Sequence, residues 1–194
     1  GGYIIAKHTL NESLIPFNID ISDSKRKLGL EDEIPVYYSD MVSTPVLSGV
    51  IKPIVIVPDN AADDMQLQVA IYHELVHYKR YDVFFKFMLF AVTSIYWFNP
   101  VIWLMNSVAL EDIELSCDES IFKKMNSEGK NLYGKSILHF AANKRCSLLF
   151  ATSFNDSKKT IATRIKNIFD ENRKKRGAFA LAMVVAIIMF SGLL

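Results

Sequence analysis

The stretch DMQLQVAIYHELVHYKR at residues 64–80 contains the pattern that most clearly indicates the fold. Aspartate and asparagine residues at 59–64 favour a helix start there, because their side chains cap free backbone N–H groups and suit the positive end of the helix dipole. We therefore predict one helix that runs to about Arg80. His73 and His77 are four residues apart, so this helix presents both imidazoles on one face.

Residues 73–77, HELVH, form an HExxH pattern. Two neutral imidazole nitrogens on one helical face can bind one metal ion, and the glutamate between them can take a proton from water at that ion. The alternative is a pair of core histidines with no metal. We predict a zinc site with His73 and His77 as ligands and Glu74 as the general base.

Catalytic zinc has three protein ligands and an open position, so a third donor must come from another segment. The two remaining histidines of the chain have no patterned context. The stretch EDIELSCDE at 111–119 instead places Glu111, Glu114 and Asp118 on one face of a predicted helix. Either Glu111 or Glu114 could be the ligand on spacing alone. Asp118, one turn beyond Glu114, could orient a ligand histidine.

Two short β-type runs precede the HExxH helix, PVYY at 35–38 and IVIV at 54–57. Pro53 and Pro58 flank the second run, and proline suits the edge of a sheet because it has no N–H to donate. An extended substrate could pair with a free edge through main-chain hydrogen bonds. We therefore expect substrate binding along one strand, made of Ile54, Val55, Ile56 and Val57. An ordinary protected edge strand is the alternative.

Composition narrows the class of protein. Of 194 residues, 51% are hydrophobic and 22% are charged, which excludes global disorder. The net charge of +1 argues against direct nucleic-acid binding. Two cysteines cannot form a disulfide framework. The mean hydropathy of +0.17 is high for a soluble domain and directs attention to membrane segments.

Residues 177–194 contain no charge and follow the basic run RKKR at 173–176. Basic residues accumulate on the cytoplasmic side of membrane helices. We therefore expect a cytoplasmic domain over 1–176 and a truncated transmembrane helix over 177–194. A second apolar run, 83–105, carries one charge, Lys86, and is broken at Asn99-Pro100. This run could cross the bilayer, enter it and return, or lie in the core of the soluble part.

Several stretches together resemble one family. HELVHYKRYD at 73–82, IYWFNPVIWLMN at 95–106 and ELSCDE at 114–119 are similar to the BlaR/MecR-type antirepressor metallopeptidases. The stretches PVLSGVIKPIVIVP at 45–58 and TRIKNIF at 163–169 are also similar. The resemblance implies a gluzincin-like α+β fold that is mostly α-helical, with a small β-sheet edge and with membrane-associated and transmembrane helices.

The resemblance also implies roles for individual residues. The wider gluzincin clan shares HExxH followed by ExxxD, and this pattern selects Glu114 over Glu111 as the third zinc ligand. Asp118 then lies behind the ligands as a supporting residue. Arg80 and Asp82 match the family's HxxRxD pattern and are expected to support the site, with a helix-end or capping role as the alternative.

Members of this family are bacterial inner-membrane zinc metalloendopeptidases that act in signal transduction and antibiotic resistance, with the catalytic domain facing the cytoplasm. They cleave a cytoplasmic DNA-binding repressor, or cause its removal, and also cleave themselves. The resemblance therefore implies a protein substrate, a lipid bilayer as partner and Zn²⁺ as cofactor. The exposed polar loop after residue 152 is a candidate for self-cleavage, at Ser153–Phe154.

Two alternatives to this function stay open. One is a membrane processing or quality-control protease of the HtpX or CAAX type. The other is a non-catalytic membrane signalling scaffold. The sequence specifies neither the inducing signal nor the oligomeric state.

Overall fold

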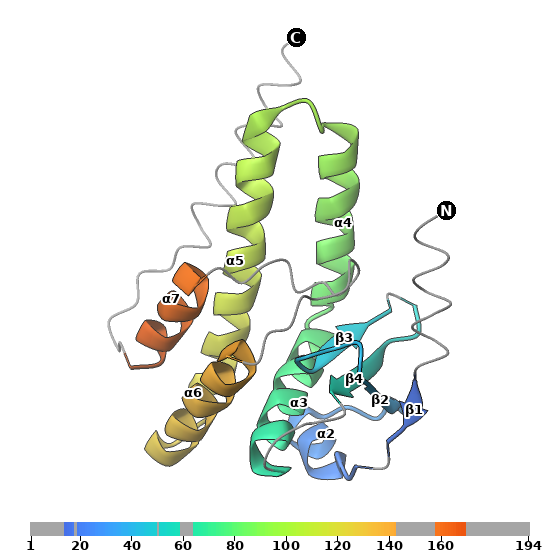
Figure 1. Cartoon of the computed structure of the whole chain (residues 1–194), viewed down its shortest axis with the longest axis vertical. Coiled ribbons are helices and arrows are strands. Elements are labelled where there is room, and N and C mark those ends of the chain that lie inside the picture. The colour runs from blue at the N-terminus through green and yellow to red at the C-terminus, as the bar shows by residue number, and fades with distance from the viewer. Residues whose placement is uncertain (1–13, 18, 50, 59–63, 143–157, 170–194) are drawn as a thin grey trace.

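The computed structural model describes residues 14–17, 19–49, 51–58, 64–142 and 158–169. These residues form a mostly helical α+β fold, with a small sheet at one end and a long helical hairpin extending from the other (Figure 1). In chain order the elements are β1 (Ile15–Pro16), α2 (Ser22–Leu28), β2 (Val36–Ser39), β3 (Val46–Ser48), β4 (Ile54–Pro58), α3 (Asp64–Lys79), α4 (Asp82–Ile95), α5 (Pro100–Phe122), α6 (Ser127–Ala142) and α7 (Lys158–Phe169).

The sheet has the strand order β1-β2-β4-β3, with β2 parallel to β4 and the other two pairs antiparallel. The predicted edge position of Ile54–Val57 is therefore wrong, because β4 has a hydrogen-bonded neighbour on both sides. Val55, Ile56 and Val57 are at most 1% exposed, so this strand is buried on both faces. Pro53 and Pro58 lie at its ends, where a missing N–H costs the ladder little. The edge strand on this side is β3.

Helix α3 lies at the centre of the fold, in contact with α2, α4, α5, α6 and β3. Its core residues Leu67, Ile71 and Leu75 recur every four positions and are at most 3% exposed. They belong to one hydrophobic core with the inner residues of the sheet and with Ile121 of α5. Because its apolar stripe is held on the sheet side, the histidine face of α3 turns toward the other helices.

A tight turn joins α3 to α4. Tyr81 has φ +58°, a left-handed conformation that residues other than glycine rarely adopt. Its N–H donates to the carbonyl of Tyr78, and the chain then starts α4 directly at Asp82. The turn brings Asp82 back beside the last turn of α3, where its side chain is buried.

The apolar run 83–105 forms two helices rather than one, and Figure 1 shows α4 and α5 side by side in a long hairpin. Asn99 caps α5 by accepting the N–H of Val101 at 3.0 Å, and Pro100 occupies the first turn, where its missing N–H is not needed. Within the described ranges, no helix is both long enough and apolar enough to cross a membrane. The predicted membrane helix 177–194 lies outside these ranges.

Of the three alternatives for the run 83–105, a place in the protein core is wrong, because many of its large side chains are exposed. Phe84, Phe87 and Phe90 on α4 are 49%, 50% and 61% exposed, and Leu104 on α5 is 60% exposed. The base of the hairpin, in contrast, packs against α3 and α7. The hairpin thus has a buried base that builds the site and an outer part without a protein partner among the described residues.

Candidate metal centre

His73 and His77 extend from α3 into a cleft of about 520 Å³. Residues of α3, α4, α5, α6 and α7 line this cleft, together with Thr44, Pro45 and Val46 at the edge strand β3. His77 is buried and His73 retains a small exposed fraction. The HExxH face of α3 therefore opens onto this cleft. The spacing of the histidines along the helix did not predict where the cleft lies.

One nitrogen of each imidazole is held by a partner. The Nδ1 atom of His77 lies 2.7 Å from Oδ2 of Asp82, and Nδ1 of His73 lies 2.6 Å from the hydroxyl of Tyr133. Tyr133 donates its own hydroxyl proton to Oδ1 of Asp118 at 2.6 Å. Each Nδ1 is therefore assigned as the donor, which leaves both Nε2 lone pairs free. Partners of this kind fix ring orientation in metal sites.

The two free Nε2 atoms lie 3.0 Å apart, and each is 3.5 Å from a carboxylate oxygen of Glu114. Three groups that can act as metal ligands thus converge on one point. Tetrahedral zinc with bonds of about 2.0–2.1 Å separates its ligand atoms by about 3.3 Å, so the spacing of this donor set fits the ion. Glu111 lines the same cleft but is not the carboxylate beside the histidines.

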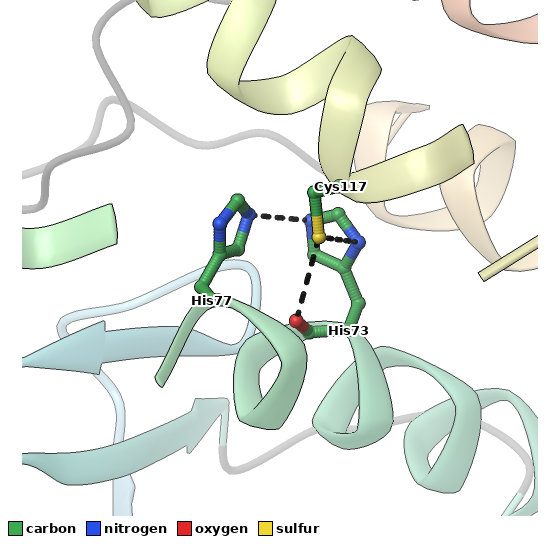
Figure 2. Close-up of side chains that lie close together, drawn as sticks. All are labelled: His73, His77 and Cys117. Atoms are coloured by element: carbon green, nitrogen blue, oxygen red, sulfur yellow. Dashed lines mark hydrogen bonds between the residues drawn. The ribbon is translucent and has the colours of Figure 1, made fainter. Parts of the chain in front are cut away.

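Cys117 offers a further donor. His73, His77 and Cys117 form a buried cluster that could hold a metal, with one donor atom from each residue within 4.8 Å of the others. Figure 2 shows both histidines rising from α3 toward the Cys117 side chain, which descends from α5. The sulfur lies 3.6 Å from Nδ1 of His73, the nitrogen that already contacts Tyr133. Metal binding at that nitrogen would displace Tyr133.

Glu74 points toward the edge strand. Its Oε2 atom accepts the backbone N–H of Leu47 on β3 at 2.9 Å, and its side chain lines the cleft beside the histidines. One carboxylate oxygen is thus anchored, and the carboxylate lies between the histidine pair and β3. This is where a base would act on a chain bound along that strand.

Asp118 supports the site through Tyr133 rather than by direct contact with a histidine. It is fully buried, and its nearest oxygen is 3.7 Å from Nδ1 of His73. Arg164 of α7 binds the same carboxylate with two N–H groups, Nε at 2.8 Å and Nη2 at 2.9 Å. Its Nη1 also lies 3.7 Å from Glu114. Helix α7 is therefore tied directly to the centre.

Three side chains at the centre were not identified from the sequence: Lys86, Tyr133 and Arg164. Lys86 of α4 donates to Oε1 of Glu114 at 2.9 Å. The sequence could have indicated two of them. Lys86 is the single charge in 83–105, and Arg164 lies in the TRIKNIF stretch that resembles the family. Tyr133 carried no signal, since nothing local distinguishes it from a core tyrosine.

Two predicted positions remain, Arg80 and the self-cleavage position. Arg80 lies beside Asp82, with Nε at 3.2 Å from Oδ2, so it shares the carboxylate that holds His77. The predicted self-cleavage position Ser153–Phe154 lies outside the described residues.

The charges of the centre favour bound cations. Burial alone would lower the pKa of His73, but the neighbouring Cys117 sulfur and Glu114 carboxylate outweigh it and raise that pKa to about 10. Burial likewise opposes ionisation of Glu114, yet His77 and Lys86 hold its pKa well below the usual range. The Glu114 carboxylate therefore stays ionised and favours a positive charge beside it, either protons on the histidines or a metal ion.

Comparison with known proteins identifies the family. The sequence profile described as BlaR1 peptidase M56 matches residues 11–168, which include every residue of the centre. The chain belongs to the BlaR1 peptidase M56 family. It is 30% identical over 176 residues to the regulatory protein BlaR1 of Bacillus licheniformis, a match that covers 85% of this chain and 29% of that protein.

Two staphylococcal relatives extend the comparison. The methicillin resistance mecR1 protein of Staphylococcus aureus is 26% identical over 89% of this chain and 28% of its own length. The regulatory protein BlaR1 of Staphylococcus aureus is 24% identical over 78% of this chain and 27% of its own length. The chain thus spans less than a third of the length of the curated relatives it matches.

Proposed function

We propose that the chain is the catalytic domain of a zinc metalloendopeptidase, with His73, His77 and Glu114 as metal ligands. The observation that carries the proposal is the convergence of two Nε2 atoms and one carboxylate, 3.0–3.5 Å from one another, at the wall of one cleft. Membership of a peptidase family supports the same conclusion. Three protein ligands leave the fourth position open, as hydrolysis requires.

Zinc at this centre would polarise the scissile carbonyl and lower the pKa of its water toward about 7. Glu74 is the general base: it takes a proton from the attacking water and passes it to the leaving amine. Its anchored contact with Leu47 keeps it in position for both transfers. Asp82 orients His77, and Asp118 with Tyr133 orients His73.

The substrate is an extended polypeptide that pairs with β3. This strand is at the sheet edge, and its first residue, Val46, lines the cleft together with the preceding Thr44 and Pro45, whereas β4 is paired on both sides. An extended chain on β3 would pass directly over Glu74. The substrate strand is thus Val46–Ser48 in place of the predicted Ile54–Val57.

We infer a regulatory role in antibiotic resistance, since two of the matched relatives are named regulatory protein BlaR1 and methicillin resistance mecR1 protein. The protein substrate is then a cytoplasmic DNA-binding repressor, with self-cleavage at Ser153–Phe154. The basic run 173–176 before the uncharged segment 177–194 supports a location of the catalytic domain at the cytoplasmic face of the bacterial inner membrane.

A non-catalytic scaffold is the second candidate, and Cys117 is the observation that favours it. If the sulfur joined the histidines and a carboxylate as a fourth ligand, the centre would be closed and structural. A closed centre has no position for water and no use for Glu74.

Zinc content and peptide cleavage, measured on the same samples, separate the two candidates. The catalytic proposal expects about one zinc per chain in the parent and in Cys117→Ala and Glu111→Ala, and loss of zinc in Glu114→Ala. It also expects Glu74→Gln to retain zinc and lose cleavage of a quenched-fluorescence peptide library. Zinc loss in Cys117→Ala, together with no Glu74-dependent cleavage, would instead establish the scaffold.

A further inference from the structure

The outer part of the α4–α5 hairpin is covered by exposed apolar side chains. We call this set the hairpin surface; its members are 40–68% exposed and comprise Phe84, Phe85, Phe87, Met88, Phe90, Val92, Ile95, Tyr96, Trp97, Phe98, Val101, Trp103, Leu104 and Val108. A contiguous apolar surface of this kind marks an interaction site rather than ordinary solvent exposure.

The hairpin surface covers more than half of α4 rather than one narrow stripe on it. At about 100° per residue, the exposed positions from Phe90 round to Phe85 cover about 220° of the helix circumference. The side bearing Asp82, Lys86 and Thr93 is turned inward. A folded partner would cover one face, whereas an apolar surface over more than half of the circumference suits a lipid environment.

Several polar groups of the hairpin are hydrogen-bonded within the hairpin itself. The 24 residues 87–110 contain no charged side chain. The hydroxyls of Thr93 and Ser94 donate to carbonyls one turn back, both at 2.8 Å. Trp103 donates its indole N–H to the carbonyl of Trp97 at 2.8 Å. Lipid imposes this internal pairing, because no water is present to hydrogen-bond the remaining polar groups.

The length of the hairpin matches one leaflet. Along α4, the rise of about 1.5 Å per residue places Ile95 about 14 Å beyond Lys86. A single leaflet contributes about 15 Å of hydrocarbon, half of the bilayer core. With Lys86 near the headgroup level, the turn at 96–99 would reach the bilayer midplane and the chain would return through α5.

We propose that the α4–α5 hairpin is a re-entrant membrane anchor that inserts into one leaflet and returns, with the acyl chains of the bilayer as its partner. The sequence independently predicts a membrane helix at the uncharged segment 177–194, which would bring a bilayer beside the domain. The anchor fixes the distance of the catalytic cleft from the membrane surface. Trp103, Ser107 and Leu110 line that cleft, and they lie on α5, which is one arm of the hairpin.

The consequence concerns the substrate and rests on the proposed peptidase function. If Lys86 lies at the headgroup level, the Glu114 carboxylate that it binds lies there too. The scissile bond of a substrate would then be close to the membrane surface. The anchor itself does not depend on catalysis and is tested separately.

Tryptophan fluorescence tests the anchor selectively, because the only two tryptophans of the chain, Trp97 and Trp103, are both in the hairpin. The full chain is reconstituted in phosphatidylcholine vesicles that contain phosphatidylglycerol, with bromine atoms either near the headgroup or deep in the acyl chains. The segment 177–194 contains no tryptophan and adds no signal. We expect blue-shifted emission, strong quenching by the deep bromines, and protection from aqueous iodide.

Two results would overturn the proposal. Red-shifted emission that iodide quenches would place the hairpin in water. Blue-shifted emission that no brominated lipid quenches would show that protein covers the hairpin, whether a second copy or segment 177–194. Single variants Trp97→Phe and Trp103→Phe assign the depth, and Trp97 at the turn should be quenched more strongly by the deep bromines.

A matched pair of charge variants provides a second measurement. Phe90→Glu introduces a carboxylate in the inserted part, whereas Met65→Glu introduces one at a 60% exposed position on α3. We expect Phe90→Glu to shift tryptophan quenching from deep to shallow bromines and Met65→Glu to leave it unchanged. Zinc content of both variants reports folding of the centre independently. Equal quenching in a zinc-loaded Phe90→Glu sample would contradict insertion.

Discussion

Replacement of Arg164 by methionine should destabilise the domain strongly, because it leaves a buried carboxylate without its counter-ion. Asp118 is 0% exposed and accepts two hydrogen bonds from Arg164 and one from Tyr133. Breaking a buried ion pair on one side costs about 3–5 kcal/mol. A domain of this size is stable by roughly 5–15 kcal/mol, so the loss is a large fraction of the total.

The assay is thermal unfolding of the metal-free chain in detergent and chelator, followed by circular dichroism at 222 nm. At roughly 2–4 °C per kcal/mol, Arg164→Met should lower the unfolding midpoint by about 6–20 °C. Arg26→Met is the matched control, because Arg26 pairs with Asp23 at the surface with 82% of its side chain exposed. Such an exposed pair contributes little to stability, because water screens it.

A second substitution isolates the cause. Adding Asp118→Asn to Arg164→Met removes the uncompensated charge, so the double variant should be more stable than Arg164→Met alone. If Arg164→Met shifted the midpoint no more than Arg26→Met, or if Asp118→Asn gave no recovery, the buried ion pair would not be what holds α7 to the centre.

Three further outcomes follow from the same geometry. Lys86→Met should raise zinc affinity about tenfold, measured by chelator competition, because the ammonium 2.9 Å from Glu114 competes with the ion; unchanged or weaker binding would contradict this competition. Tyr133→Phe should weaken zinc binding about 10–100-fold by removing the hydroxyl that holds His73, whereas Tyr78→Phe, which removes a hydroxyl that binds Asp32, should not; equal losses would indicate a general folding defect. Leu75→Ala should lower the free energy of unfolding by about 2–5 kcal/mol in denaturant titration, since Leu75 is fully buried in the core; a loss below about 1 kcal/mol would mean that α3 is not packed as described.

The features that the sequence determined by itself are those governed by local geometry. The four-residue spacing of His73 and His77 fixes them on one face of α3 whatever surrounds the helix. Asn99-Pro100 ends one helix and caps the next through its own side chain and ring, so the break in the apolar run was predictable. The family resemblance, carried by several motifs in order, was likewise present in the sequence and is confirmed by the comparisons.

The features that only the tertiary structure decided depend on contacts between segments distant in the chain. The central position of β4 results from its pairing with both β2 and β3, and flanking prolines carry no information on strand order. Glu114 rather than Glu111 lies beside the histidines because packing sets the rotation of α5 against α3. Tyr133 and Arg164 reach the centre from α6 and α7, helices that begin at Ser127 and Lys158, far along the chain from the HExxH motif. A local pattern specifies which face a side chain occupies, but only the packing of the chain specifies what that face meets.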